Sequence, residues 1–169
     1  DLQETQEYYM DILECAARHH LMVNFHGATI PRGWQRTYPN MVSVEAVYGA
    51  EWYNNLPILT NRAACHNATI PFTRNVIGPM DYTPGAVTNV KPRHFVKNND
   101  CPVSEGTRSH QAALYVLFYA PLQMLCDSPT QYAKYPAYTS FIASVPTNWD
   151  ESKAIDAKMG EYVVLARRK

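Results

Sequence analysis

The sequence lacks the features that mark several large classes of protein. Its 169 residues carry 15 basic and 15 acidic side chains, so no net positive charge favours nucleic acid or an anionic membrane surface. It has no G-x-S-x-G motif and no Ser/His/Asp arrangement, which argues against a stand-alone small αβ hydrolase. The longest apolar run, 112–126, is broken by Gln123 and Pro121. We expect this run to be too short to cross a bilayer, and we recognise no signal-peptide pattern within these 169 residues.

The cysteines exclude further kinds of site. No C-x-x-C pair occurs among the four of them, Cys15, Cys65, Cys101 and Cys126. Zinc-finger and thioredoxin chemistry therefore have no spacing to support them. Cys15 and Cys126 lie on apolar faces of predicted helices, so we expect buried free thiols there rather than disulfides.

The amino-terminal part of the chain predicts one helix and two strands. Apolar residues recur at helical spacing over residues 2–19, with charged residues on the other face, which predicts an amphipathic helix. The short apolar run 21–25 is typical of a strand covered on both faces, as in parallel sheets. Residues 41–44 are a second, weaker strand candidate, and 47–53 can turn helical. A helix, a buried strand and a loop at the strand's carboxyl end make one αβ unit of a wound or barrel fold.

The rest of the chain predicts a change from αβ units to hairpins. Residues 68–72 and 78–85 are the ordered parts of a proline-rich stretch. We expect a helix over 104–126 and a strand over 141–145 that closes a barrel. The alternation and turn residues that follow predict a β-hairpin, so we place a domain boundary near residue 147.

The densest group of functional side chains follows the first predicted strand. Carboxylates, hydrogen-bond donors and aromatic rings gather there: His26, Arg32, Trp34, Arg36, Tyr38, Asn40, Glu45, Tyr48, Glu51 and Trp52. Glycoside hydrolysis uses two carboxyl groups, one to protonate the leaving oxygen and one to attack or to activate water. Glu45 and Glu51 are a candidate pair. The alternative is that both are solvated residues at the start of a helix.

Three further groups are candidate substrate contacts. His26 ends the strand and could hydrogen-bond a sugar hydroxyl, although a capping or packing role is equally consistent with its place. Asp81 lies in a loop flanked by glycine and proline, where it either contacts substrate or forms an Asx-turn. Arg36 and Asn40 offer a guanidinium and an amide for carbohydrate or for orienting a carboxylate, and a structural ion pair is the alternative.

Four sequence blocks in this order resemble glycoside hydrolase family 97: HGATIPRGWQRTYPN, EAVYGAE, NATIPFTR and GPMDYTPG. Members of that family are calcium-dependent bacterial α-glycosidases with an N-terminal β-sandwich, a central (β/α)8 barrel and a C-terminal β-domain. The resemblance covers nearly the whole chain and implies an α/β fold. Residues 1–147 would form the second half of a TIM barrel, from the helix after strand 4 to strand 8. Residues 148–169 would begin the C-terminal β-domain. The chain begins without Met and stops just after a strand-like run, so we expect it to be a piece of a larger polypeptide.

The resemblance also implies roles for individual residues. Glu51 matches the general acid, Glu45 matches a carboxylate that binds calcium, and His26 matches a histidine that contacts substrate. Glu51 lies beside the ion in the family and is a further possible ligand. Inverting members have a glutamate base directly after this histidine, whereas Gly27 stands here, so the chain resembles the retaining branch. The retaining nucleophile, an Asp at the end of strand 4, would precede Asp1.

The expected function is that of a fragment of a retaining α-glycosidase, most similar to an α-galactosidase. It would act on oligosaccharides through a covalent glycosyl-enzyme intermediate, in the periplasm or outside the cell. Half a barrel leaves strand edges unpaired, so we expect it to need the rest of its parent polypeptide or self-association, and to be inactive alone. An α-glucosidase-type member and a non-catalytic carbohydrate-binding fragment remain alternatives.

Overall fold

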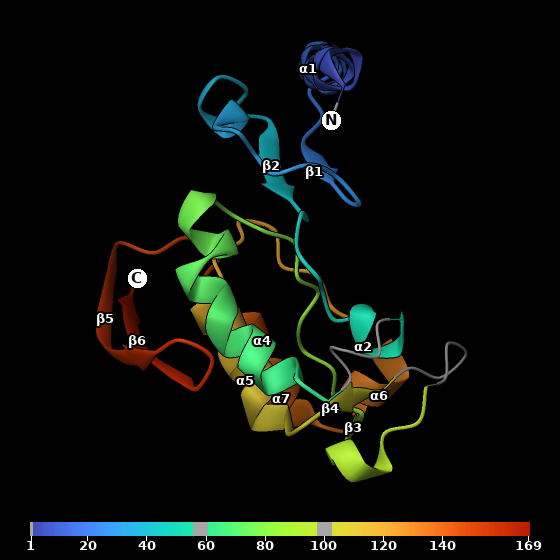
Figure 1. Cartoon of the computed structure of the whole chain (residues 1–169), viewed down its shortest axis with the longest axis vertical. Helices are drawn as coiled ribbons and strands as arrows, with labels where there is room; N and C mark the ends of the chain where they lie inside the picture. Colours follow the sequence, from blue (N-terminus) through green and yellow to red (C-terminus); the bar gives the residue numbers. More distant parts are fainter. Residues whose placement is uncertain (1, 56–60, 98–102) are drawn as a thin grey trace.

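The computed structural model describes residues 2–55, 61–97 and 103–169 (Figure 1). The helices are α1 (Gln3–Arg18), η1 (Trp34–Arg36), α2 (Trp52–Asn55), α4 (Ala63–Thr69), η2 (Ile70–Phe72), η3 (Arg74–Ile77), η4 (Pro92–His94), α5 (Arg108–Leu117), α6 (Pro129–Ala133) and α7 (Pro136–Ser144). The strands are β1 (Val23–Phe25), β2 (Met41–Val44), β3 (Asn89–Val90), β4 (Ser104–Glu105), β5 (Glu151–Lys158) and β6 (Tyr162–Arg168). None of the described helices combines the length and apolar character that a membrane span requires.

The predicted first helix and the two strands after it are confirmed as elements. The burial expected over 21–25 is wrong, because Leu21 and Met22 are exposed and β1 is half-buried. Helix α1 has an acidic residue in its first turn and Arg18 in its last, an arrangement that complements the helix dipole. Its one buried residue, Leu13, packs with Met41 and Val44 of β2. Strands β1 and β2 pair in parallel, with Asn24 opposite Ser43. This unit lies at the top of Figure 1, above helices α4, α5 and α7.

Two further extended segments continue the sheet beyond β2. Val44 forms a parallel bridge with Met80, and the N–H of Met80 donates a hydrogen bond to the carbonyl of Tyr119 at 3.1 Å. Four extended segments therefore lie side by side in the order in which they occur in the sequence: β1, β2, the segment around Met80 and the segment around Tyr119. Side chains that follow parallel strands meet at one edge of the sheet, which is where α/β folds place their sites.

Two predicted helices differ from the observed ones in extent. The helix expected over 104–126 is α5 alone: Thr107 caps its start by accepting a hydrogen bond from the His110 N–H at 3.1 Å. The chain turns extended at Phe118, just before Pro121, and Pro cannot donate to a helical ladder. The helical stretch expected over 47–53 begins only at Trp52.

The strand expected over 141–145 is also wrong. These residues lie mostly in α7, which has Pro136 in its first turn, a position where proline favours helix initiation. A short apolar run cannot be assigned to strand or helix by its periodicity alone. The extended segment beside Met80 is the one around Tyr119 instead. By contrast, the predicted hairpin is confirmed as the antiparallel pair β5–β6.

The cysteine prediction holds in part. Cys15, Cys65 and Cys126 carry free thiols. Cys126 is partly buried, which raises its pKa to about 12, but it lies between α5 and α6 and not on a helix face. Cys15 is exposed on α1, so the expectation of a buried thiol there is wrong. Cys101 lies outside the described residues.

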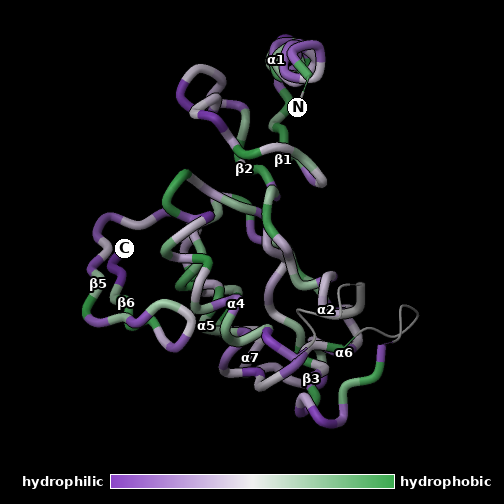
Figure 2. The backbone as a smooth tube through the Cα atoms, in the orientation of Figure 1, coloured by the Kyte–Doolittle hydropathy of each residue, from purple (hydrophilic) through white to green (hydrophobic). Residues whose placement is uncertain are grey.

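A buried polar network joins the segment after Glu51 to the segment after Asp81. The hydroxyls of Tyr53 and Tyr82 hydrogen-bond one another. Tyr82 donates to Asn67 Oδ1 at 2.6 Å, and Asn67 Nδ2 donates to the Tyr53 hydroxyl at 3.1 Å. All three residues are buried, so each of these groups needs its partner. Figure 2 shows the hydrophobic colouring of β2. Met41 and Val44 of this strand belong to one buried cluster, and Tyr53 and Tyr82 belong to another.

Candidate active site

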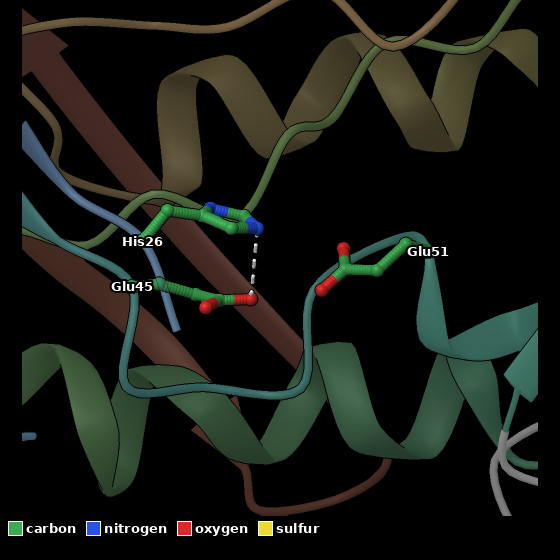
Figure 3. Close-up of side chains that lie close together, drawn as sticks. All are labelled: His26, Glu45 and Glu51. Carbon is green, nitrogen blue, oxygen red and sulfur yellow. Dashed lines mark ion pairs between the residues drawn. The ribbon is translucent and has the colours of Figure 1, made fainter. Parts of the chain in front are cut away.

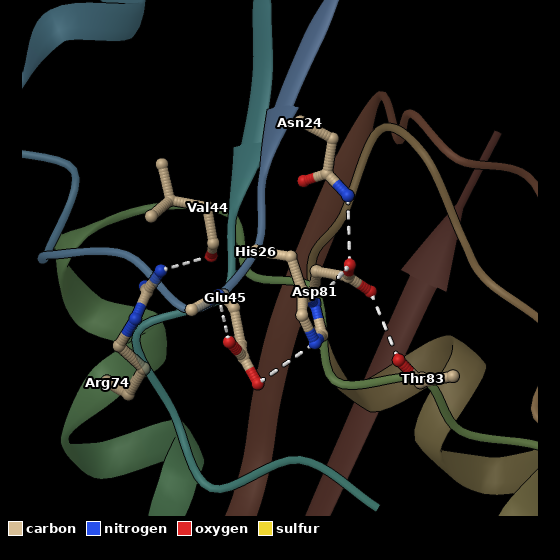
Figure 4. Close-up of polar contacts among 8 residues, drawn as sticks. Asn24, His26, Val44, Glu45, Arg74, Asp81 and Thr83 are labelled. Atoms are coloured by element: carbon tan, nitrogen blue, oxygen red, sulfur yellow. Dashed lines mark hydrogen bonds and ion pairs between the residues drawn. The ribbon is translucent and has the colours of Figure 1, made fainter. Parts of the chain in front are cut away.

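Polar side chains lie at the ends of neighbouring extended segments (Figure 4). His26 directly follows β1, and Glu45 directly follows β2. Asp81 follows Met80, which pairs with the last residue of β2. Residues 55 positions apart in the sequence are thereby brought into contact.

The imidazole of His26 bridges two buried carboxylates. Its Nε2 lies 3.6 Å from Glu45 Oε1, and its Nδ1 lies 3.4 Å from Asp81 Oδ2. The side chain of His26 is 57% exposed, whereas those of Glu45 and Asp81 are 7% and 2% exposed. The two ring nitrogens thus face buried carboxylates, while more than half of the His26 side chain remains exposed to a ligand.

Asp81 is fixed by groups that the sequence did not indicate. Asn24 Nδ2 donates to its Oδ2 at 2.9 Å, and Thr83 Oγ1 donates to its Oδ1 at 3.4 Å. Thr83 takes a positive φ of 59°, which is uncommon for a β-branched residue. The one available signal was the polar Asn24 inside an otherwise apolar strand.

Glu45 is oriented by the main chain of Gly27. The Gly27 N–H donates to Glu45 Oε2, and Glu45 Oε1 faces His26. Gly27 has a φ of 65°, and a Cβ added there would meet no atom within 4 Å. A methyl group would therefore fit at this position, although the backbone conformation favours glycine.

Glu51 lies beside this group at the start of α2 (Figure 3). One ligand atom each of His26, Glu45 and Glu51 lies within 4.8 Å of the others. Burial, then a hydrogen bond with Glu45, raises the pKa of Glu51 to about 7, with a smaller contribution from the Glu45 charge. Glu51 does precede a helix, but Glu45 is buried and Glu51 half-buried, so the alternative that both are solvated is wrong. A carboxyl group that is partly protonated at neutral pH can act as a general acid.

The same three side chains have the chemistry of a cation site. Two carboxylates that share a hydrogen bond are stabilised by a nearby positive charge. Calcium takes six to eight oxygen ligands, among them carboxylate oxygens. Glu45 and Glu51 can supply carboxylate oxygens here. The donor set therefore fits a calcium ion whose remaining ligands come from water, substrate or other parts of the protein.

Comparison with known proteins shows what this chain is similar to. A sequence model described as "Glycoside hydrolase 97" matches residues 1–47. The chain is 43% identical to a retaining alpha-galactosidase from Bacteroides thetaiotaomicron over 169 residues, which is 100% of this chain and 25% of that protein. It is 39% identical to a probable retaining alpha-galactosidase from Streptomyces bingchenggensis, covering 98% of this chain and 23% of that protein.

The chain belongs to glycoside hydrolase family 97. Its structure is similar to a crystal structure of a beta-arabinopyranosidase, with a TM-score of 0.87 and 38% identity over 100% of this chain and 27% of that one. It is also similar to a family 97 enzyme from Pseudoalteromonas sp. strain K8 in complex with acarbose, with a TM-score of 0.77 and 34% identity over 94% and 23%. This family 97 chain thus spans about a quarter of the length of these relatives.

Several candidates from the sequence lie elsewhere in this family 97 chain. Asn40 Nδ2 donates to the carbonyl of Leu13 at 2.9 Å, and the Tyr38 hydroxyl donates to Glu14 at 3.3 Å. Both side chains therefore contact α1, beside the start of β2. The expectation that Asn40 contacts carbohydrate is wrong, and Arg36 lies exposed on η1 in the same part of the chain.

Aromatic side chains stand next to the carboxylates. The rings of Tyr48 and Trp52 meet edge to face at 5.1 Å between centroids. Both line a cavity of about 370 Å³ that also has Glu45 and Gly27 in its wall. An apolar ring face beside hydrogen-bonding groups is the combination that carbohydrate binding uses.

Proposed function

We propose that this chain is part of a retaining α-glycosidase, most similar to an α-galactosidase. It would hydrolyse terminal α-linked sugars of oligosaccharides through a covalent glycosyl-enzyme intermediate. The observation that carries this proposal is the half-buried Glu51, with a pKa raised to about 7, beside Glu45 and His26 at the strand ends. The names of the two curated relatives support the retaining and galactoside parts of the proposal.

In this reaction, Glu51 would donate its proton to the glycosidic oxygen as that bond breaks. It would then take a proton from the water that hydrolyses the covalent intermediate. The accessible imidazole of His26, with Asp81 behind it, would hydrogen-bond a sugar hydroxyl. Gly27 offers only its N–H, so no carboxylate at this position could activate water for inversion. The attacking carboxylate would be an Asp outside these residues.

Calcium would be held by Glu45, with Glu51 as a possible further ligand. Glu45 is suited to this because its Oε2 is fixed by the Gly27 N–H while each oxygen keeps further lone pairs. When bound, calcium supplies positive charge that stabilises negative charge developing on nearby oxygens.

We further propose that residues 1–147 form the second half of the catalytic barrel. Strands β1 and β2 and the segments around Met80 and Tyr119 would be barrel strands 5 to 8. Residues 148–169 would begin the C-terminal β-domain. The rest of the parent polypeptide would supply the remaining strands and the nucleophile, and the enzyme would work in the periplasm or outside the cell.

The test is hydrolysis by the full-length parent protein of three aryl glycosides. We expect kcat/KM for the α-D-galactoside to exceed that for the α-D-glucoside by at least about 10-fold, the scale of one well-placed hydroxyl contact. Efficient cleavage of the glucoside would instead support an α-glucosidase. Sugar binding without turnover would support a carbohydrate-binding role and contradict the proposal.

A β-L-arabinopyranoside is the third substrate because of the structural neighbour named beta-arabinopyranosidase. This sugar has the ring configuration of an α-D-galactoside and lacks only the hydroxymethyl group. A preference for it would retain the mechanism and change the assigned substrate.

A further inference from the structure

The side chain of Arg74 is a buried cation. This residue begins η3 and is 8% exposed. Within residues 2–55, 61–97 and 103–169, no carboxylate lies within ion-pairing distance of it. Burial lowers its pKa to about 10, which leaves the guanidinium charged at neutral pH. Burying an unpaired charge costs free energy unless hydrogen bonds satisfy it.

Within the described residues, the guanidinium of Arg74 hydrogen-bonds main-chain carbonyls beside the site. Nη2 donates to Val44 at 2.8 Å (Figure 4) and to Pro79 at 2.9 Å. Nε donates to Ala46 at 3.2 Å, and Nη1 donates to Gly78 at 3.1 Å. One guanidinium thus hydrogen-bonds the main chain on both sides of Glu45 and also the main chain just before Met80 and Asp81.

The main chain at this point has a conformation that needs support. Ala46 takes a positive φ of 38°, which is unfavourable for a residue with a side chain. Its carbonyl is one of those that Arg74 binds. The Val44 carbonyl also accepts a hydrogen bond from the Asp81 N–H at 3.3 Å. Arg74 therefore donates to the same oxygen atom that joins the end of β2 to the segment of Asp81.

We propose that Arg74 is a positioning residue of the active site, whose guanidinium fixes the ends of two neighbouring strands so that Glu45 and Asp81 face His26. The inference rests on the proposed function for its catalytic consequence, but the placement of the two carboxylates can be observed independently. Lysine would keep the charge at position 74. Its donors sit on one nitrogen, however, and cannot span four separate carbonyls as the planar fork does.

The experiment compares Arg74→Lys with wild type in the full-length parent protein. We expect kcat on an α-galactoside disaccharide to fall by at least about 30-fold with KM changed less than about 3-fold, because misplacing catalytic groups by about 1 Å costs on the order of 100-fold in rate. Arg167→Lys is the matched control. Arg167 is also partly buried and donates to the carbonyl of Leu117 at 3.1 Å, but it lies on β6, so its kcat should stay within about 2-fold.

A crystal structure of Arg74→Lys supplies the readout that does not depend on activity. We expect Glu45 to move away from the Gly27 N–H and Asp81 to move away from His26. Unchanged positions of both carboxylates would overturn the proposal, as would a variant with lowered Tm but wild-type kcat. If the wild-type protein cleaves no galactoside, the proposed function fails, and the crystal structure alone decides the role of Arg74.

Discussion

Replacing Glu51 by Gln removes a transferable proton while keeping the shape of the side chain. With a pKa of about 7, about half of the wild-type side chains carry the proton at pH 7. General acid catalysis by such a group contributes roughly 10² to 10⁴-fold, or about 3 to 5 kcal/mol of barrier. We therefore expect Glu51→Gln to lose that factor in kcat/KM on a galactoside disaccharide, whose sugar leaving group needs protonation.

The decisive comparison uses a leaving group that needs no proton. On dinitrophenyl α-galactoside, the full-length Glu51→Gln protein should keep kcat/KM within about 10-fold of wild type, because dinitrophenolate departs unaided. Loss of the base should then slow hydrolysis of the covalent intermediate. Azide, which needs no deprotonation, should restore turnover and yield α-galactosyl azide.

The control is Glu14→Gln on α1, whose carboxylate contacts Tyr38. It should behave as wild type on both substrates. Equal losses on both substrates for Glu51→Gln, with no effect of azide, would refute the assignment of Glu51 as the acid.

Three other predictions concern the parent protein. Chelation of calcium should abolish most activity, and Glu45→Gln should raise the calcium concentration needed to restore it by at least about 10-fold; full activity in metal-free protein would contradict this. Burial and Glu45 raise the pKa of Glu51 to about 7, and the positive charge of bound calcium would lower it again. The acid is protonated below its pKa, so kcat/KM should fall as pH rises, with a midpoint at or below about 7. A profile that stays flat to alkaline pH would remove this assignment. Gly85→Ala should destabilise the protein by roughly 2 kcal/mol or more, because Gly85 has a φ of 96° and its new methyl group would press on the buried Tyr115 ring. Gly33→Ala has positive φ without crowding and should cost about 1 kcal/mol; equal losses of Tm would contradict the packing argument.

The sequence predicted correctly those elements that are specified by residues close together in the chain. Helix α1 follows from helical spacing, and the hairpin β5–β6 follows from alternation around a turn. His26 and Glu45 became candidates because each follows a predicted strand, and Glu51 because it lies in the short stretch expected to turn helical; their individual roles were implied by the family resemblance. The strand expected over 141–145 failed because a short apolar run fits both kinds of element, and Pro136 decided in favour of a helix.

Residues whose roles depend on distant partners could not be found in the sequence. Asn24 supports Asp81 from 57 positions away, and Arg74 reaches Val44 across 30 positions. Neither spacing leaves a periodic signal, because tertiary folding alone brings these groups together. Asn40 illustrates the converse case: it lies among functional residues in the sequence, yet its amide binds the carbonyl of Leu13.

The most direct test of the central claim is the anomeric form of the first product released by the full-length protein. Proton NMR can follow cleavage of an α-galactoside before mutarotation mixes the anomers. A retaining enzyme, with Glu51 as acid and then base, should release α-galactose first. Initial release of β-galactose would contradict the covalent mechanism and the place assigned to Gly27 in it.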